Sequence, residues 1–299
     1  MNLLFNHNEI IEQIHNTLDV KPNTSIRLKR MVHGVANSVY KFSIGNSENV
    51  IKIYHREFDS KLSSNLLNWC SKVGIPVPPL ISINDNIAIY RYSQGTHKYV
   101  LDNEMIANLS VIINRIHSFP IDEVSGKNLI EKIRVYYDYL INISPKIIPN
   151  KVCNKILSHY ENITSKKEIH SDGLYVLHGD ISPTNVLWVN KKIASVLDFD
   201  ECSIGPRMYD VAVTACKFSL GCHNTINKNY IDHFFSIFLK CSSHISSKTE
   251  INPFIDLYIM KVLLEKFFLI ETHQIDCNSK RQKTDPWQKW ANYIIEGDV

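Results

Sequence analysis

Two short stretches decide the fold: VLHGDISPTNVL at residues 176–187 and SVLDFD at residues 195–200. In each, polar residues directly follow or precede an apolar run that is typical of a buried strand. Strands of this kind hold the neighbouring loops rigidly, so that side chains from separate loops can converge on one point. We therefore expect Asp180, Asn185 and Asp198 to converge in this way.

Carboxylate and amide oxygens define the chemistry expected from these residues. Mg²⁺ prefers hard oxygen ligands and completes its shell with water and substrate phosphates, so the side chains of Asn185 and Asp198 are enough to hold it. Each residue alone has an ordinary structural explanation, since Asp180 could cap a turn, Asn185 could lie in a loop and Asp198 could end a strand. Their combined spacing favours a functional site.

The spacing H-G-D-x-x-x-x-N followed by D-F-D resembles the signature of the aminoglycoside phosphotransferase and choline kinase superfamily, whose members are relatives of protein kinases. The resemblance implies that Asp180 is the catalytic base or orienting residue for an acceptor hydroxyl. It also implies that Asn185 and Asp198 hold Mg²⁺ on the phosphates of ATP or GTP. His178 would pack the loop, and Asp210 would begin the next helix and accept hydrogen bonds from the loop backbone.

The same resemblance assigns phosphate-binding parts to the N-terminal region. Lys52 lies in the apolar segment 50–53, and an exposed lysine on an edge strand would be its ordinary explanation. With the downstream motif present, Lys52 is expected to bind the nucleotide phosphates. The preceding segment 33–40 resembles the loop that covers the nucleotide, and Ser38 is expected to reach phosphate oxygens from it, although such loops also join ordinary hairpins.

A hinge between two lobes is expected at residues 91–95. There the backbone of Arg91, Tyr92 and Ser93 would pair with the adenine edge of the nucleotide. Residues 74–78, GIPVP, also match the family between a helix and a strand. The resemblance thus covers most of the chain.

One position departs from the family pattern. Ser63 stands where the family usually has the helix glutamate that pairs with the strand lysine, and Glu57 is the nearest upstream carboxylate. The sequence leaves open which carboxylate, if any, pairs with Lys52. If none does, slow turnover or an unusual nucleotide site is expected.

The predicted elements change character near residues 93–96. Before this point, short apolar runs in 26–54 are punctuated by turn residues, which is typical of an antiparallel meander. A helix is expected at 8–18 and another at 60–73, followed by a strand at 86–92. These elements form a small lobe built from a sheet and helices.

Beyond residue 96 the periodicity is helical, and one apolar face is formed by Met105, Leu109, Ile112, Ile113 and Ile116. Further helices are expected at 129–143, 151–166 and from 207 onward, with strands at 175–177, 186–189 and 193–197. We predict an α+β, two-lobed protein-kinase-like fold with a small antiparallel-sheet N-lobe and a larger, mainly helical C-lobe. The N-terminal nucleotide-binding lobe would span residues 1–92, and the C-terminal catalytic and substrate-binding lobe residues 93–299.

Composition bounds the function further. The 299 residues are 44% hydrophobic and carry a net charge of +3, which gives no basic footprint for nucleic acid. The N-terminus has no signal-peptide pattern, and the apolar stretch 254–270 is interrupted by charges, so we expect a core helix and no membrane segment. The seven cysteines are scattered without a C-x-x-C pair, which is typical of reduced thiols. A cytoplasmic monomer or homodimer is expected.

Three classes of function compete: a small-molecule kinase, a protein kinase and a pseudokinase-like scaffold. Asp198 and Asp210 lie only twelve positions apart, which leaves no room for a peptide-docking segment. Ser182 also stands where serine/threonine kinases usually have a lysine. A scaffold would predict decay of the motif, whereas Lys52, Asp180 and the metal-binding pair are present.

The sequence says less about the acceptor. An aminoglycoside or another hydroxylated antibiotic is the first expectation, with antibiotic resistance as the biological role. An amino-alcohol metabolite such as homoserine, choline or ethanolamine is the alternative. Acidic residues in the C-terminal third are offset by basic ones, Lys217 among them, so charge does not decide. Trp287, Trp290 and Tyr293 could form an aromatic box for a quaternary amine, but their spacing is typical of core packing.

Overall fold

The computed structural model describes residues 6–21, 24–31, 37–55, 59–84, 86–123, 126, 128–143, 146–223, 226–242, 245 and 249–272. Contacts between Cα atoms divide the chain into two compact units. The first unit contains Met1–Lys98 and Thr184–Cys202, and the second contains Tyr99–Pro183 and Ser203–Val299. A hairpin from far along the chain thus packs with the N-terminal residues. The lobe boundary between residues 92 and 93 stays a prediction.

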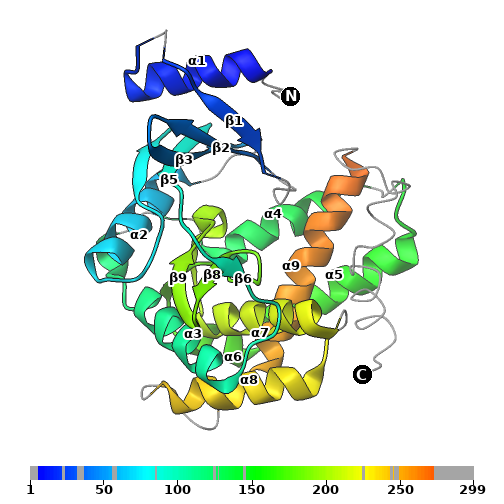
Figure 1. The fold of residues 1–299 in the computed structure, drawn as a ribbon. Coiled ribbons are helices and arrows are strands. Elements are labelled where there is room, and N and C mark those ends of the chain that lie inside the picture. The colour runs from blue at the N-terminus through cyan, green and yellow to red at the C-terminus, as the bar shows by residue number, and fades with distance from the viewer. Residues whose placement is uncertain are drawn as a thin grey trace. The chain divides into compact units, whose positions relative to one another are not determined.

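A five-stranded antiparallel sheet with the order β1-β2-β3-β5-β4 forms the body of the first unit (Figure 1). Its strands are β1 (Arg27–Arg30), β2 (Ser38–Ile44), β3 (Ser47–Ile53), β4 (Leu80–Ile83) and β5 (Ile87–Arg91). Gly45 makes the turn between β2 and β3 with a φ of +56°, a conformation that glycine adopts readily. The predicted antiparallel meander is confirmed.

Helix α1 (His7–Leu18) covers one face of this sheet. It begins with a capping box, in which the Asn6 side chain accepts from the Glu9 backbone and the Glu9 side chain accepts from the Asn6 backbone. The apolar contacts join α1 to β2, β3 and β5 through Ile10, Ile14, Phe42, Ile51, Ile53, Ile87 and Ile89. Because side chains alternate along a strand, Lys52 points away from this core, to the other face of the sheet.

Helix α2 (Ser60–Lys72) follows an N-cap in which Asp59 accepts from the Leu62 N–H over 2.9 Å. The helix ends before Gly74, which has a φ of +71°. It packs against β4 and against the short 3₁₀ helix η2 (Phe199–Glu201). This packing ties α2 to the D-F-D segment.

A smaller sheet of β6 (Thr96–His97), β8 (Val186–Val189) and β9 (Lys192–Val196) completes the first unit. Gly95 precedes it with a φ of +153°, and a Cβ added there would lie 2.8 Å from the Leu187 Cβ. Only glycine permits this close approach. The Val196 N–H donates to the Pro76 carbonyl over 2.8 Å, which anchors the hairpin.

The second unit is mainly helical (Figure 1). Its helices are α3 (Asn103–Ile116), η1 (Ile121–Glu123), α4 (Leu129–Asn142), α5 (Asn150–Thr164), α6 (Lys167–Ser171), α7 (Arg207–His223), α8 (Lys228–Lys240) and α9 (Asn252–Glu271), and β7 (Tyr175–Leu177) pairs antiparallel with β10 (Ser203–Gly205). Helix α9 packs against α4, α5 and α7. The five apolar positions predicted to form one face of α3 are all buried.

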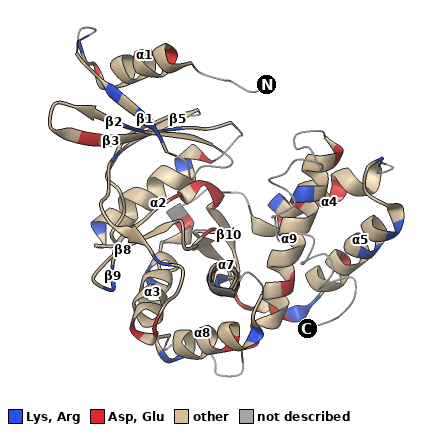
Figure 2. Ribbon diagram, turned by 45° about the vertical axis from the view of Figure 1, so that its right-hand side comes forward, with Lys and Arg blue, Asp and Glu red and all other residues tan. Residues whose placement is uncertain are grey.

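Helix α9 contains the apolar stretch 254–270 and is a core helix, as predicted. None of the helices in the described part of the chain combines the length and the apolar character needed to cross a membrane. Basic and acidic residues are interspersed along the helices (Figure 2). The described cysteines that are free are mostly buried: Cys70, Cys153, Cys202 and Cys216, with Cys241 partly exposed.

Candidate nucleotide and phosphotransfer site

A cavity of about 410 Å³ lies within the first unit, which is within the usual size range of small-molecule sites. Its walls come from the sheet, from the segment after β5 and from the β8–β9 hairpin. The lining includes most of the residues that the sequence predicts to bind nucleotide and metal: Lys52, Arg91, Tyr92, Ser93, Asn185 and Asp198. Apolar side chains complete it, among them Val39, Val50, Leu67 and Leu187.

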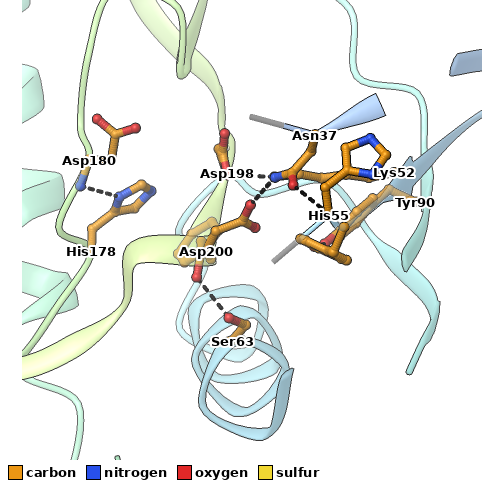
Figure 3. Close-up of polar contacts among 11 residues, drawn as sticks. Asn37, Lys52, His55, Ser63, Tyr90, His178, Asp180, Asp198 and Asp200 are labelled. Carbon is orange, nitrogen blue, oxygen red and sulfur yellow. Dashed lines mark hydrogen bonds and ion pairs between the residues drawn. The ribbon is translucent and has the colours of Figure 1, made fainter. Parts of the chain in front are cut away.

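Lys52 reaches into this cavity from β3 and is paired with two carboxylates. Its Nζ lies 2.6 Å from Asp198 Oδ1 and 2.5 Å from Asp200 Oδ2 (Figure 3). Burial alone would lower the pKa of Lys52, but the two carboxylates outweigh burial and hold this pKa above its ordinary value. The lysine therefore stays protonated at neutral pH.

Asp200 shares the ammonium of Lys52 with Asp198, so that two carboxyl groups compete for one positive charge. Burial, followed by the charge of Asp198, raises the pKa of Asp200 to about 7, while Lys52 opposes this shift. Asn37 Nδ2 also donates to Asp200 Oδ2 over 2.8 Å (Figure 3). The His55 N–H donates in turn to Asn37 Oδ1 over 3.4 Å. Asp200 is thus held by two side chains.

Ser63 does not supply a carboxylate to Lys52. Its side chain is buried on α2, and the hydroxyl donates to the Phe199 carbonyl over 2.7 Å (Figure 3). The question that the sequence left open is thus answered by Asp198 and Asp200, which are the carboxylates paired with Lys52. Glu57, the other candidate from the sequence, lies outside the described residues.

Asn185 and Asp198 lie on adjoining backbone, because the Leu197 N–H donates to the Asn185 carbonyl over 2.8 Å. Asp198 has a φ of 66° and a ψ of 71°, a left-handed conformation that is unfavourable for most residues other than glycine. Both side chains line the cavity and offer oxygens. This donor set fits Mg²⁺ with phosphate and water completing the shell. In the described part of the chain, no three His, Cys, Asp or Glu side chains form a metal cluster.

The predicted hinge residues line the cavity, but two of their backbone donors are already used. The Arg91 N–H donates to the Pro79 carbonyl over 2.9 Å, and the Tyr92 N–H donates to the Glu48 carbonyl over 3.1 Å. Ser93 follows them and also lines the cavity. The Arg91 and Tyr92 N–H groups therefore stabilise the backbone of the first unit and are not free to donate to a nucleobase.

Ser38 is placed differently from the other predicted nucleotide residues. It begins β2, its hydroxyl lies 2.8 Å from His55 Nε2, and it is not among the described residues that line the cavity. Residues 32–36 of the predicted covering loop lie outside the described part of the chain. The role predicted for Ser38 stays a prediction.

The second unit carries the H-G-D loop with Asp180. The Asp180 N–H donates to His178 Nδ1 over 3.2 Å (Figure 3), so the buried histidine packs the loop as predicted. Gly179 has a φ of +79°. Asp210 accepts from the His178 N–H over 2.9 Å and from the Gly179 N–H over 2.7 Å. The predicted bracing of the loop by Asp210 is confirmed.

Asp210 is fully buried, and it also lies 3.0 Å from His117 Nε2. Burial by itself would raise the pKa of Asp210, but its net pKa is lowered by the His117 hydrogen bond and charge, by His178 and by the Gly179 N–H. The buried carboxylate is therefore kept ionised by its partners. This makes Asp210 a fixed electrostatic anchor for the loop.

Lys217 on α7 forms an ion pair with the Asp180 carboxylate. This contact was not predicted from the sequence, where Lys217 is one of several basic residues of the region. A signal was present, because Lys217 follows Asp210 by seven residues on the same helix. Residues spaced by seven share one helix face, so a helix that braces the loop through Asp210 also presents Lys217 to it.

Comparisons with known proteins bear on these two sites. A model of a phosphotransferase enzyme family matches residues 167–232, which contain the H-G-D loop, the D-F-D segment and α7. No curated protein sequence matches the chain. Three solved structures with a similar fold are each 15% identical to it.

An amicoumacin kinase in complex with AMP-PNP and Ca²⁺ is 15% identical, with a TM-score of 0.71 over 98% of this chain and 96% of its own. A Plasmodium vivax ethanolamine kinase is 15% identical, with a TM-score of 0.72 over 100% of this chain and 93% of its own. The choline kinase LicA from Streptococcus pneumoniae is 15% identical, with a TM-score of 0.70 over 97% of this chain and 99% of its own.

These likenesses bear out the predicted fold class, α+β with an antiparallel sheet in the N-terminal part and helices in the C-terminal part. The chain has the fold of kinase-like small-molecule phosphotransferases, and its predicted resemblance to the aminoglycoside phosphotransferase and choline kinase superfamily is confirmed.

Proposed function

We propose that this protein is an ATP-dependent phosphotransferase that moves the γ-phosphate onto a hydroxyl of a small molecule. The observation that carries the proposal is the shared cavity of Lys52, Asn185 and Asp198, in which a buried ammonium and the side-chain oxygens of Asn185 and Asp198 lie together. An ammonium and hard oxygen donors in one cavity suit a triphosphate that carries Mg²⁺.

Each residue has a role in nucleotide binding. Lys52 binds phosphate oxygens, for which it exchanges its contact with Asp198 while it keeps Asp200. Asn185 and Asp198 hold the metal ion, which neutralises the charge of the phosphates when it is bound. Because the Arg91 and Tyr92 amides donate within the sheet, we assign the amide donor toward the nucleobase to Ser93.

Asp180 orients the acceptor hydroxyl. In the transfer, a bond forms between the acceptor oxygen and the γ-phosphorus, and the bond from that phosphorus to the bridging oxygen of ADP breaks. The hydroxyl proton passes to the Asp180 carboxylate and from there to solvent. The transition state is loose and the proton leaves late, so Asp180 contributes more by orientation than by basicity.

The acceptor classes raised by the sequence stay open at this level. They are aminoglycosides and other hydroxylated antibiotics, with resistance as the role, and amino alcohols such as homoserine, choline or ethanolamine. The named substrates of the similar structures, amicoumacin, ethanolamine and choline, come from both classes. A scaffold without turnover is disfavoured because Lys52, Asn185, Asp198 and Asp180 are all retained.

The test is ATP consumption by the purified chain against a panel of these acceptors, with phosphorylated product detected by mass spectrometry. Transfer should require Mg²⁺ and stop in excess EDTA. Lys52→Ala should raise the KM for ATP at least tenfold, whereas Lys61→Ala, an exposed lysine on α2, should behave as wild type. Transfer in excess chelator, or unchanged ATP kinetics in Lys52→Ala, would refute the proposed site.

A further inference from the structure

Helix α7 follows the H-G-D loop through three successive contacts. Asp210 binds the His178 and Gly179 amides, and Lys217 pairs with Asp180. Further along, Gly221 packs so closely that an added Cβ would lie 3.1 Å from Pro183 Cγ and 3.3 Å from Tyr99 Cδ1. One helix thus contacts the loop from its start to its end.

The spacing of these contacts explains why Lys217 is fixed in place. Positions 210, 217 and 221 recur at seven and four residues, which places them on one face of a helix. Asp210 at one end and Gly221 at the other fix the helix along the loop. Lys217 is therefore held beside Asp180 by the register of the helix and not by the flexible reach of its own side chain alone.

Two carboxylates and one further ammonium face Lys217. Lys217 faces Asp180 from the loop, and Lys261 and Glu265 from α9, where Lys261 Nζ lies 3.3 Å from Glu265 Oε2. Burial, followed by the charge of Lys261, lowers the pKa of Lys217 to about 7, while Glu265 opposes the shift. An ammonium in such surroundings gains from an additional negative group.

Both members of the ion pair remain accessible to a ligand. The Lys217 side chain is 28% exposed and that of Asp180 is 22% exposed. Tyr99 lies at the Gly221 contact, one helical turn after Lys217, and is 47% exposed, so it offers an aromatic surface on the same side of α7. A small organic acceptor can therefore reach a carboxylate, an ammonium and an aromatic ring within the second unit.

We propose that Lys217 binds an anionic group of the acceptor, so that the substrate of the proposed phosphotransferase is a hydroxyl compound carrying a carboxylate or a phosphate. The inference rests on the proposed function, because it assigns Asp180 to the acceptor hydroxyl. When the acid group takes Lys217, the Asp180 carboxylate is released from its ion pair and accepts from the hydroxyl. A polycation or a quaternary amine would instead add positive charge beside Lys217 and Lys261, which disfavours it.

The test uses acceptors that differ in charge on similar skeletons. The acidic arm contains 4-hydroxybutyrate and glycerate as carboxylates and glycerol 3-phosphate as a phosphate. The cationic arm contains 4-amino-1-butanol, choline and kanamycin. Two readouts are taken with the full chain: ADP release with Mg·ATP, and the shift in Tm that each compound causes in the presence of Mg·AMP-PNP.

Variants separate charge recognition from a purely structural role. Lys217→Gln should raise the KM for the acidic acceptor at least tenfold and abolish its Tm shift, with the KM for ATP unchanged. Lys217→Arg should restore part of the effect. Lys240→Gln, the same change at an exposed end of α8, should match wild type. A structural role alone would lower kcat for every acceptor alike and would leave the acid-specific Tm shift.

Two outcomes would overturn the inference. One is phosphorylation or stabilisation by the cationic arm in preference to the acidic arm. The other is the absence of any acidic compound that stabilises the wild type more than Lys217→Gln. Failure of the proposed function itself would look different, because Mg·AMP-PNP alone would then cause no Tm shift that depends on Lys52 and Asp198.

Discussion

The hydroxyl of Ser63 on α2 donates a 2.7 Å hydrogen bond to the backbone carbonyl of Phe199, the central residue of the D-F-D segment. At the helix position where the resembled family usually has a glutamate, this chain thus has a serine that forms an uncharged hydrogen bond to the loop. The charge that Lys52 needs comes instead from the same loop, through Asp198 and Asp200. Lys52 and helix α2 consequently both contact the D-F-D segment.

Replacing Ser63 with alanine should lower the free energy of unfolding by about 1–2 kcal/mol, because a buried hydrogen bond to a backbone carbonyl is lost. Urea denaturation measures this change. Ser64→Ala is the matched control, since the Ser64 hydroxyl bonds only locally to the Lys61 carbonyl and its loss should cost less than about 0.5 kcal/mol. Equal stability of the two variants would contradict a role for Ser63 in holding the loop.

Asp200→Asn should raise the KM for ATP about tenfold and lower kcat less, because Lys52 then retains only Asp198 as a charged partner and competes with metal for it. Asp198→Asn should instead abolish Mg²⁺-dependent turnover. Calorimetric titration with Mg·AMP-PNP distinguishes weaker binding from lost binding. Asp232→Asn, an exposed residue on α8, is the control. Identical binding defects in the two loop variants would argue against separate roles for these aspartates.

Asp180→Asn preserves the shape of the side chain and removes its charge. We expect kcat to fall about a hundredfold or more, with ATP binding nearly unchanged, because the residue orients the acceptor and does not bind nucleotide. Steady-state kinetics and a Mg·AMP-PNP titration measure the two effects. Near-normal turnover by a folded Asp180→Asn protein would remove this residue from the mechanism and revive the scaffold alternative.

Asp210→Asn should reduce the free energy of unfolding at pH 7 by about 3–5 kcal/mol, because it breaks a buried network around an ionised carboxylate. The folded-state pKa of Asp210 is lowered. Its charge therefore stabilises the fold above the ordinary aspartate pKa of about 4, and this contribution is lost as the pH falls through the lower folded value.

Denaturation at a series of pH values checks this expectation. The difference between wild type and Asp210→Asn should shrink as the pH falls below about 4. Asp138→Asn removes an exposed carboxylate that lies 3.5 Å from Arg134 and should change stability by less than about 1 kcal/mol at any pH. A difference that stays constant with pH would mean that Asp210 acts through packing and not through charge.

Local patterns in the sequence were sufficient for most of the secondary structure. The strands predicted at 175–177 and 186–189 have the observed bounds, and the helix predicted at 60–73 ends one residue earlier. Apolar periodicity and turn residues determine such elements within a short window. The two-residue strand β6 and the three-residue strand β10 were not predicted, because they form only through pairing with distant segments.

Long-range pairing also limited what could be predicted of the site. The motif identified Lys52 and Asp198, but the partner of Lys52 across 148 positions, Asp200, depends on how the sheet and η2 pack. The contact of Lys217 with Asp180 was not predicted for a related reason, because it depends on the helix face that Lys217 shares with Asp210. Spacing along one helix was visible in the sequence, but the loop that this face contacts was not.

The contacts between α7 and the H-G-D loop have an evolutionary consequence. A residue inserted into α7 would rotate the later contacts by about 100° and separate Lys217 and Gly221 from the loop, so helix and loop must be inherited together. The family match at residues 167–232 contains both of these segments, while the fold as a whole is shared at 15% identity. Helix α7 and the H-G-D loop are therefore expected to change together, because each keeps the other in register.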